Sequence, residues 1–352
     1  MISFIVPAHN EQAGLARTVS SIHTAARSVG LPYEIIVVDD ASTDATAEVA
    51  RQNQATVLPV QHRQISATRN SGGRAAAGDR LFFVDADTLI DARTVASALR
   101  QMDQGAAGGG ASTRLEGPVP LYARLLMFLF FVGSKVADLT GGACMYCTRE
   151  AFLAVGGFDE SLFGGEEVAM AFALKRRGPF VVLWHRVLTS GRRFRSMGGL
   201  QLLFSLLRMG WMPSRTLRRR GPVEKIWYNS NRQNDNRTDL PLAHRVSDFL
   251  ALALLLLLVA APLVRFVPWP KSFWESPLGA LRMVAAVFLS HLGLILWPFA
   301  YFLFRSLLQQ KRWAARLKIT ALIAYCLWSG RDSTLAVISL WRSFFGWLAG
   351  VI

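Results

Sequence analysis

The stretch Leu81-Phe82-Phe83-Val84-Asp85-Ala86-Asp87 decides the fold, because two carboxylates directly follow a short apolar run. Side chains on a strand alternate between its two faces, so the two aspartates would point to the same side. An earlier run, Ile35-Ile36-Val37-Val38, ends at Asp39 in the same way. Continuously apolar runs are typical of buried parallel strands, whose ligands bind at their carboxyl ends. We therefore expect these acids to gather at one edge of a parallel sheet.

Short apolar runs alternate with helix-like stretches through the first 110 residues. This alternation predicts an α/β fold with a mostly parallel sheet and helices on both faces. The predicted strands are Ile2–Pro7, Glu34–Val38, Thr56–Val60 and Leu81–Val84, and the predicted helices are Ala13–Val29, Ala45–Gln52, Ala67–Ala77 and Leu162–Arg177. Leu125–Gly133 is apolar but too short to cross a bilayer, so it is either buried or lies along a membrane surface.

Composition and missing fingerprints exclude several classes of protein. Hydrophobic residues make up 52% of the chain and charged residues 18%, which excludes a disordered chain. Three cysteines cannot form a disulfide scaffold, and the first residues lack the basic segment of a signal peptide. Neither G-x-G-x-x-G nor G-x-x-x-x-G-K-[ST] is present, which argues against dinucleotide-binding dehydrogenases and P-loop NTPases.

The character of the chain changes near residue 236. Two long apolar runs predict transmembrane helices at about 249–267 and 283–304, followed by an interfacial helix or a third membrane helix. We expect a catalytic domain at 1–235 and a membrane region at 236–352. Nearly all of the net charge of +15 lies beyond residue 200, around these runs, so phospholipid and not nucleic acid is the expected partner.

The distribution of basic residues also predicts the orientation. Basic residues precede the first apolar run and follow the second, which the positive-inside rule assigns to the cytoplasm. The protein is therefore expected to be a multi-pass protein of the cell inner membrane with a cytoplasmic catalytic domain. Arg218-Arg219-Arg220 is interpreted as a contact with lipid headgroups.

Asp85 and Asp87 are candidate metal ligands. Paired hard oxygens at a sheet edge suit Mg²⁺ or Mn²⁺, which could bridge a diphosphate and neutralise a leaving phosphate. A D-x-D sequence by itself is more often a solvated turn. Its place after a buried strand favours the metal site.

Four stretches, in order, resemble the motifs of family-2 glycosyltransferases, and the resemblance covers roughly residues 1–235. They are Val6-Pro7-Ala8-His9-Asn10-Glu11, the run from Ile35 to Asp44, Phe83-Val84-Asp85-Ala86-Asp87, and Gly156-Gly157-Phe158-Asp159-Glu160 with Gly165-Glu166-Glu167. The resemblance implies a GT-A fold, a nucleotide-sugar donor, a divalent metal and inversion at the anomeric carbon.

The resemblance also implies roles on the donor side. Asp39 would accept a hydrogen bond from the base, usually uracil, which favours a UDP-sugar. Asp85 would lie near the ribose and the metal, and Asp87 would be the more direct metal ligand. The other residues implied to contact the nucleotide are Pro7, Ala8, Asn10, Glu11 and Arg69.

Glu166 and Glu167 stand where the family usually has Glu-Asp. Inverting transfer needs a carboxylate that takes the proton of the acceptor hydroxyl. By position Glu167 is the general base, but its extra methylene leaves open which of the two glutamates reaches the acceptor. Alternatively, both are N-terminal helix acids favoured by the helix dipole.

Arg192 and Arg193 lie in a segment that resembles one following the acceptor helix in a bacterial subgroup of the family. They either hold the departing diphosphate or face solvent or headgroups. His185, just before them, is either a metal ligand or a structural histidine.

Two further patterns favour structural roles. Asp40, Ser42 and Asp44 are interpreted as a capped turn before a helix. Cys144 and Cys147 would face opposite sides of a strand, which argues against a metal or redox pair.

These observations favour an inverting glycosyltransferase with a lipid or polyprenyl-phosphate acceptor at the cytoplasmic membrane face. Two alternatives stay open: transfer to a soluble or other hydrophobic acceptor, with the membrane helices only as anchor, and a non-catalytic membrane scaffold that retains the fold.

Overall fold

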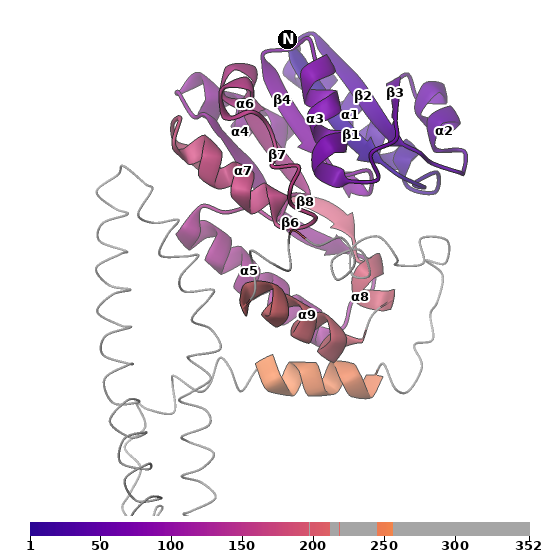
Figure 1. The fold of residues 1–352 in the computed structure, drawn as a ribbon, viewed down its shortest axis with the longest axis vertical. Helices are drawn as coiled ribbons and strands as arrows, with labels where there is room; N and C mark the ends of the chain where they lie inside the picture. Colours follow the sequence, from indigo (N-terminus) through magenta and orange to yellow (C-terminus); the bar gives the residue numbers. More distant parts are fainter. Residues whose placement is uncertain (197, 212–217, 219–244, 256–352) are drawn as a thin grey trace, which may run out of the picture. The chain divides into compact units, whose positions relative to one another are not determined.

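A computed structural model of the chain describes residues 1–196, 198–211, 218 and 245–255 (Figure 1). The chain divides into two units, Met1–Phe249 and Leu250–Ile352. The boundary predicted near residue 236, two of the three arginines at 218–220, the run 283–304 and most of the run 249–267 lie outside the described residues. Within the described ranges, no helix is both long and apolar enough to span a membrane.

An eight-stranded sheet forms the centre of the first unit, in the order β3-β2-β1-β4-β7-β6-β8-β5. The strands are β1 (Ile2–Ala8), β2 (Tyr33–Asp40), β3 (Thr56–Val60), β4 (Arg80–Val84), β5 (Thr88–Leu89), β6 (Gly108–Glu116), β7 (Cys144–Thr148) and β8 (Phe180–Ser190). All four predicted strands are present, and β1 pairs in parallel with β2 and β4.

The sheet as a whole is mixed, so the prediction of a mostly parallel sheet holds only for its first half. β7 runs antiparallel to both β4 and β6, and β5 runs antiparallel to β8. The reason for the reversal at β7 is that the chain leaves β6 at the carboxyl edge, forms a helix and re-enters the sheet from that same edge. The amino end of β7 therefore lies beside the carboxyl ends of β4 and β6.

Helices cover both faces of the sheet, as predicted (Figure 1). α1 and α4 pack against each other on one face, and α3, α6 and α7 contact strands on the other. The helices are α1 (Leu15–Val29), α2 (Thr46–Gln52), α3 (Ile65–Ala75), α4 (Ala92–Asp103), α5 (Leu121–Ala137), α6 (Arg149–Val155), α7 (Glu166–Lys175), α8 (Arg192–Ser196) and α9 (Gly199–Trp211). Residues 245–255 are also helical. This α/β architecture agrees with the GT-A fold that the family resemblance implies.

Local sequence explains where several helices begin and end. α1 buries Leu15, Val19, Ile22 and Ala26, whose spacing places them on one helical face, and it ends at Gly30 in the left-handed conformation. α7 begins four residues later than predicted, because Gly165 at its N-cap has φ +74°. This later start makes Glu166 and Glu167 the first two residues of the helix.

Candidate active site

The predicted site residues meet at the carboxyl edge of the sheet. β1, β2, β4, β6 and β8 all run toward this edge, and β7 starts from it. Asp39 is the penultimate residue of β2, Asp85 follows β4, and Arg192 begins the helix after β8. Residues distant in sequence therefore come close in space at the ends of neighbouring strands.

Arg69 in α3 joins two of the predicted motifs. Its guanidinium donates one hydrogen bond to Asp85 Oδ1 over 2.8 Å and another to Glu166 Oε1 over 2.8 Å. Arg69 and Glu166 are buried, with side-chain exposures of 4% and 6%. Burial lowers the pKa of Arg69, but the charges of Asp85, Glu166 and Glu167 outweigh burial and raise that pKa above its ordinary value. Arg69 is thus a permanently charged bridge between the D-x-D segment and the start of α7.

Glu167 differs from its neighbour because one of its oxygens is unsatisfied. Its Oε2 atom is buried and accepts no hydrogen bond from the described part of the chain. Burial raises the pKa of Glu167 to about 8, and the charge of Glu166 adds to this effect, while Arg69 opposes it. A buried carboxyl whose pKa lies near neutrality can exchange a proton with a bound group.

The turn before β7 leaves the space that Glu167 occupies. A Cβ atom on Gly142 would lie 2.8 Å from Glu167 Oε1, and Gly142 has φ +84°. The amide of Asp85 donates a hydrogen bond to the carbonyl of Ala143 over 3.1 Å. The D-x-D segment, this glycine turn and the start of α7 therefore line one space.

A second arginine joins the other motifs. Arg192 donates hydrogen bonds to Glu11 Oε2 over 2.9 Å and to Asp87 Oδ2 over 3.0 Å. The hydroxyl of Thr189 donates to Asp87 Oδ1 over 3.3 Å. The structure thus connects Glu11 of the first motif, Asp87 of the D-x-D segment and the arginine segment. Arg193, the next residue of α8, is half-buried.

Asp85, which accepts the hydrogen bond from Arg69, is half-buried. Burial raises the pKa of Asp85, and the charges of Asp87 and Glu167 raise it further, while Arg69 opposes the rise. Asp85 thus has a greater tendency to bind a proton than an ordinary aspartate. A cation that bound there would oppose this tendency, because it would offset the clustered negative charge.

The predicted nucleotide side is ordered by the loops after β1 and β2. Pro7 and Ala8 are buried at the end of β1, and Asn10 has φ +54°. Asn10 Oδ1 accepts a hydrogen bond from the amide of Thr43 over 2.8 Å. Asp39 is half-buried and accepts a long hydrogen bond, 3.3 Å, from the amide of Ser42. Its carboxylate is therefore weakly held, and its geometry is compatible with a polar ligand.

Asp40 has a structural position. Its buried carboxylate accepts hydrogen bonds from the amides of His62, Arg63 and Gln64 and from the hydroxyl of Thr68. Asp44 accepts from the amide of Thr46 at the start of α2, in agreement with the predicted turn before that helix. Asp40, however, anchors the entry to α3 and not the entry to α2.

His185 is not brought to the aspartates. Its ring Nδ1 lies 3.3 Å from the Ser97 hydroxyl of α4. Among the described residues, no group of three or more His, Cys, Asp or Glu side chains could hold a metal ion. The structure therefore favours the structural alternative for His185. Cys144 and Cys147 are buried in the cores on opposite faces of the sheet, as predicted.

Sequence reasoning missed two residues that shape this site. Asn70 accepts a hydrogen bond from the amide of Phe158 over 2.8 Å and donates one to its carbonyl over 2.9 Å, which fixes the Gly156–Glu160 segment to α3. Gly142 provides the room beside Glu167. The Gly141-Gly142 pair was a visible signal of a tight turn, whereas nothing local in the sequence marked Asn70.

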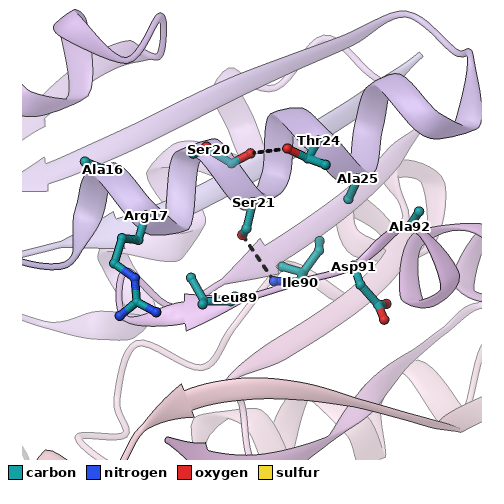
Figure 2. Close-up of a pocket in the computed structure, with 10 residues that line it drawn as sticks. All are labelled: Ala16, Arg17, Ser20, Ser21, Thr24, Ala25, Leu89, Ile90, Asp91 and Ala92. Carbon is teal, nitrogen blue, oxygen red and sulfur yellow. Dashed lines mark hydrogen bonds between the residues drawn. The ribbon is translucent and has the colours of Figure 1, made fainter.

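A separate hollow lies between α1 and the loop that enters α4 (Figure 2). Arg17, Ser21 and Asp91 border it, and the amide of Ile90 donates a hydrogen bond to Ser21 Oγ over 3.2 Å. None of the predicted site residues lines this hollow. It belongs to the packing of α1 against α4 and not to the candidate active site.

Comparison with protein families agrees with this grouping of motifs. Residues 3–140 match the model of the family described as glycosyl transferase family 2. Over these residues the chain is similar to family-2 glycosyltransferases, and the same sheet continues beyond them in β7 and β8. The matched range contains the first motif, Asp39, Arg69 and the D-x-D segment, whereas Glu166, Glu167 and Arg192 lie beyond it.

Two relatives illustrate the similarity of this chain to named proteins. The low-salt glycan biosynthesis hexosyltransferase Agl6 of Haloferax volcanii is 28% identical over 43% of this chain and 39% of its own length. The undecaprenyl-phosphate 4-deoxy-4-formamido-L-arabinose transferase of Edwardsiella ictaluri is 30% identical over 30% of this chain and 34% of its own length. The chain thus spans well under half the length of these curated relatives.

Two solved structures also resemble the chain, at low identity. The S. aureus TarS fragment 1–349 has 16% identity and a TM-score of 0.43, with coverage of 94% of this chain and 91% of that one. The mannosyltransferase PcManGT of Pyrobaculum calidifontis, solved with GDP-Man and Mn²⁺, has 17% identity and a TM-score of 0.49, with coverage of 88% and 86%.

Proposed function

We propose that this protein is an inverting glycosyltransferase that moves a sugar from a nucleotide diphosphate to a lipid acceptor, either a polyprenyl phosphate or a lipid hydroxyl. The observation that carries the proposal is the convergence of Glu11, Asp85, Asp87, Glu166 and Glu167 with two arginines at one sheet edge of a family-2 domain. Buried polar atoms in folded proteins are nearly always hydrogen-bonded, so the unsatisfied Oε2 of Glu167 favours a role with a bound substrate.

The donor would bind across the loops after β1 and β2. Asp39, whose carboxylate is weakly held, would accept a hydrogen bond from the base, which favours UDP-sugars. Pro7, Ala8 and Asn10 would border the nucleotide. Arg192 and Arg193 would contact the diphosphate, since a guanidinium forms strong hydrogen bonds with phosphate oxygens.

Asp85 and Asp87 would hold a divalent metal, Mg²⁺ or Mn²⁺, together with the donor. Magnesium is commonly bound by one or two carboxylates and by substrate phosphates, which fits a site that offers only two aspartates. The bound metal would neutralise charge on the leaving diphosphate. Arg69 keeps Asp85 oriented toward this position.

Glu167 would act as the general base for a hydroxyl acceptor. The acceptor oxygen would bond to the anomeric carbon as the bond to the nucleotide diphosphate breaks, and its proton would pass to Glu167 Oε2. Glu166 is engaged by Arg69, so it would position the start of α7 and not take the proton. Its pairing with Arg69 leaves Glu167 as the glutamate with a free oxygen.

The two kinds of lipid acceptor differ in their need for this base. A polyprenyl phosphate attacks through an oxygen that is already ionised, whereas a lipid hydroxyl must lose a proton. The relatives named as undecaprenyl-phosphate transferases favour the first, and the unsatisfied Glu167 oxygen favours the second. Glu167→Gln should therefore abolish most transfer to a hydroxyl and leave transfer to a phosphate nearly unchanged.

The test is to incubate purified full-length protein with a panel of nucleotide sugars and membrane lipid extract, and to identify products by mass spectrometry. We expect a glycosylated lipid, absent in Asp87→Ala and in excess EDTA. A product only on soluble acceptors would replace the lipid assignment. Absence of any donor-dependent product, together with metal-independent nucleotide binding, would favour a non-catalytic scaffold.

We also propose that the protein resides in the cell inner membrane as a multi-pass protein with its catalytic domain in the cytoplasm. The support is the sequence pattern of the runs 249–267 and 283–304 and the basic residues around them. Full-length protein should stay in the pellet after a carbonate wash. Its recovery in the supernatant would contradict the assignment.

A further inference from the structure

One face of α5 exposes large apolar side chains at the catalytic edge of the first unit. Leu121, Phe128 and Val132 are exposed by 60%, 58% and 43%. With the exposed Arg124 they are spaced by three and four residues, so all four lie on the same helical face. Single exposed apolar residues are ordinary, but a continuous stripe along a helix indicates an interaction surface.

Strand β8 extends this stripe with a fixed aromatic ring. Trp184 is 72% exposed, yet its ring packs 5.9 Å from Phe131 of α5, and Lys135 Nζ lies 4.5 Å from its centroid. Arg186 lies over Phe131 at 4.3 Å. Held this way, Trp184 keeps its outer face available without the loss of rotamer freedom that a mobile side chain would suffer on binding.

The exposed charged side chains of this surface are positive. Residues 117–137 and 168–211 contain no Asp or Glu, and the exposed charged side chains within the stripe and beside Trp184 are Arg124 and Arg186. Apolar side chains, an exposed tryptophan and exposed arginines together match the surface of an anionic bilayer, where Trp prefers the headgroup level and Arg contacts phosphates. Asp138 lies near Lys135 and Asp248 near Tyr122, so carboxylates border this surface, but its exposed charged side chains are arginines.

The position of α5 relates the surface to the site. α5 follows β6, whose carboxyl end shares the edge with Asp85, and Tyr122 of α5 packs 6.5 Å from Phe194 of α8. Arg192, two residues before Phe194, contacts Asp87. Figure 1 shows α5 beside the β6–β8 end of the sheet.

We propose that Leu121, Arg124, Phe128, Val132, Trp184 and Arg186 form a bilayer-contact surface for anionic phospholipid, by which the catalytic domain itself rests on the membrane. This proposal does not depend on the reaction assigned above, because any enzyme or scaffold with this surface would bind lipid there. It also differs from anchoring by the apolar runs near the end of the chain, since it concerns α5 and β8.

Photocrosslinking in the full-length protein tests this contact site by site. p-Benzoylphenylalanine replaces Phe128 or Trp184, and the matched controls replace Leu31 and Leu153, which are exposed by 45% and 54% but lie elsewhere on the domain. The protein is irradiated with phosphatidylglycerol-containing vesicles, and adducts are identified by mass spectrometry. We expect phospholipid adducts at 128 and 184 and none at 31 or 153.

Each other outcome overturns the proposal. Adducts from positions 128 and 184 to peptides of the same chain would show that another segment covers the surface, and adducts to a second copy would show self-association. No lipid adduct at either position, or equal yields at all four, would show no specific lipid contact.

The arginines are tested with Arg124→Gln and Arg186→Gln. Each variant should lower the adduct yield in phosphatidylglycerol, but not in phosphatidylcholine, by up to about fivefold, equivalent to about 1 kcal/mol.

Discussion

Arg192 donates a hydrogen bond to Asp87 Oδ2 over 3.0 Å, so the aspartate predicted to bind a metal is already paired with a protein cation. The same guanidinium contacts Glu11, and the two carboxylates raise the pKa of Arg192 further above its ordinary value despite burial. A divalent metal at Asp87 would therefore compete with Arg192 for this carboxylate. If a donor diphosphate binds Arg192, it removes the competitor and supplies metal ligands in the same step.

Arg192→Gln should consequently strengthen metal binding when no nucleotide is present. A charge-assisted hydrogen bond contributes about 1.5–3 kcal/mol, so the Kd for Mn²⁺ should fall by about tenfold to a hundredfold. The same variant should bind the nucleotide diphosphate more weakly. Calorimetric titration of Mn²⁺ and of UDP into the full-length protein measures both effects.

Arg17→Gln is the control for this experiment, since Arg17 pairs with Glu116 in an exposed bridge outside the D-x-D segment. It should change neither affinity. Unchanged Mn²⁺ affinity in Arg192→Gln would mean that Asp87 is not a metal ligand, or that the pair opens without cost.

Glu167→Gln should lower turnover on a hydroxyl acceptor by about 10²- to 10⁴-fold, because it keeps the shape of the side chain but cannot take a proton. Donor affinity should barely change. Glu166→Gln should cost less in turnover, since its role is to pair with Arg69. Steady-state kinetics, with donor binding measured separately, distinguishes the two roles. A larger loss of turnover in Glu166→Gln, with donor binding intact, would assign the role of the base to Glu166.

The first half of the fold was predictable because its signals are local. Strands such as Ile2–Pro7 and Glu34–Val38 are continuous apolar runs that end in turn residues, and β1 and β2 occupy them. β6 was not predictable in this way, because Gly108-Gly109-Gly110 has the composition of a loop. In the structure a Cβ on Gly109 would clash with the carbonyl oxygen of Val181. Glycine is required there by close packing that sequence does not show.

The candidate site shows the same contrast between local patterns, which the sequence reveals, and long-range pairings, which it does not. The acids at strand ends were predictable, since a strand followed by a carboxylate is a local pattern. The pairing of those acids was not, because Arg192 reaches Glu11 across 181 residues and Arg69 reaches Glu166 across 97. Arg69 engages Glu166, while Oε2 of Glu167 accepts no hydrogen bond from the described residues, and the sequence shows neither difference.

Asp39 and Asp40 are adjacent but should respond differently to the same substitution. Asp40→Asn should destabilise the fold by about 2–4 kcal/mol, because its buried carboxylate accepts four hydrogen bonds around the entry to α3. Asp39→Asn should leave the unfolding midpoint almost unchanged and weaken UDP binding. Thermal unfolding and nucleotide titration of both variants test this contrast. A stable Asp40→Asn protein would contradict the structural role of that residue.

Glu167 should also make the stability of the protein depend on pH. Its pKa in the folded protein, about 8, lies above its ordinary value of 4.5. Between these values the folded protein holds a proton that the unfolded chain has released, so the contribution to stability is complete below pH 4.5 and is lost as pH rises through 8.

Wild type should therefore lose stability from pH 5 to pH 9, relative to Glu167→Gln, which cannot ionise. One pKa unit corresponds to about 1.4 kcal/mol, so the relative gain of the variant should reach about 2 kcal/mol or more. Lys135 and Lys175, whose pKa values are lowered to about 8, titrate equally in both proteins, and their effects cancel. Unfolding of the two proteins at pH 5 and pH 9 measures the difference, and parallel pH profiles would show that Glu167 is already ionised at neutral pH.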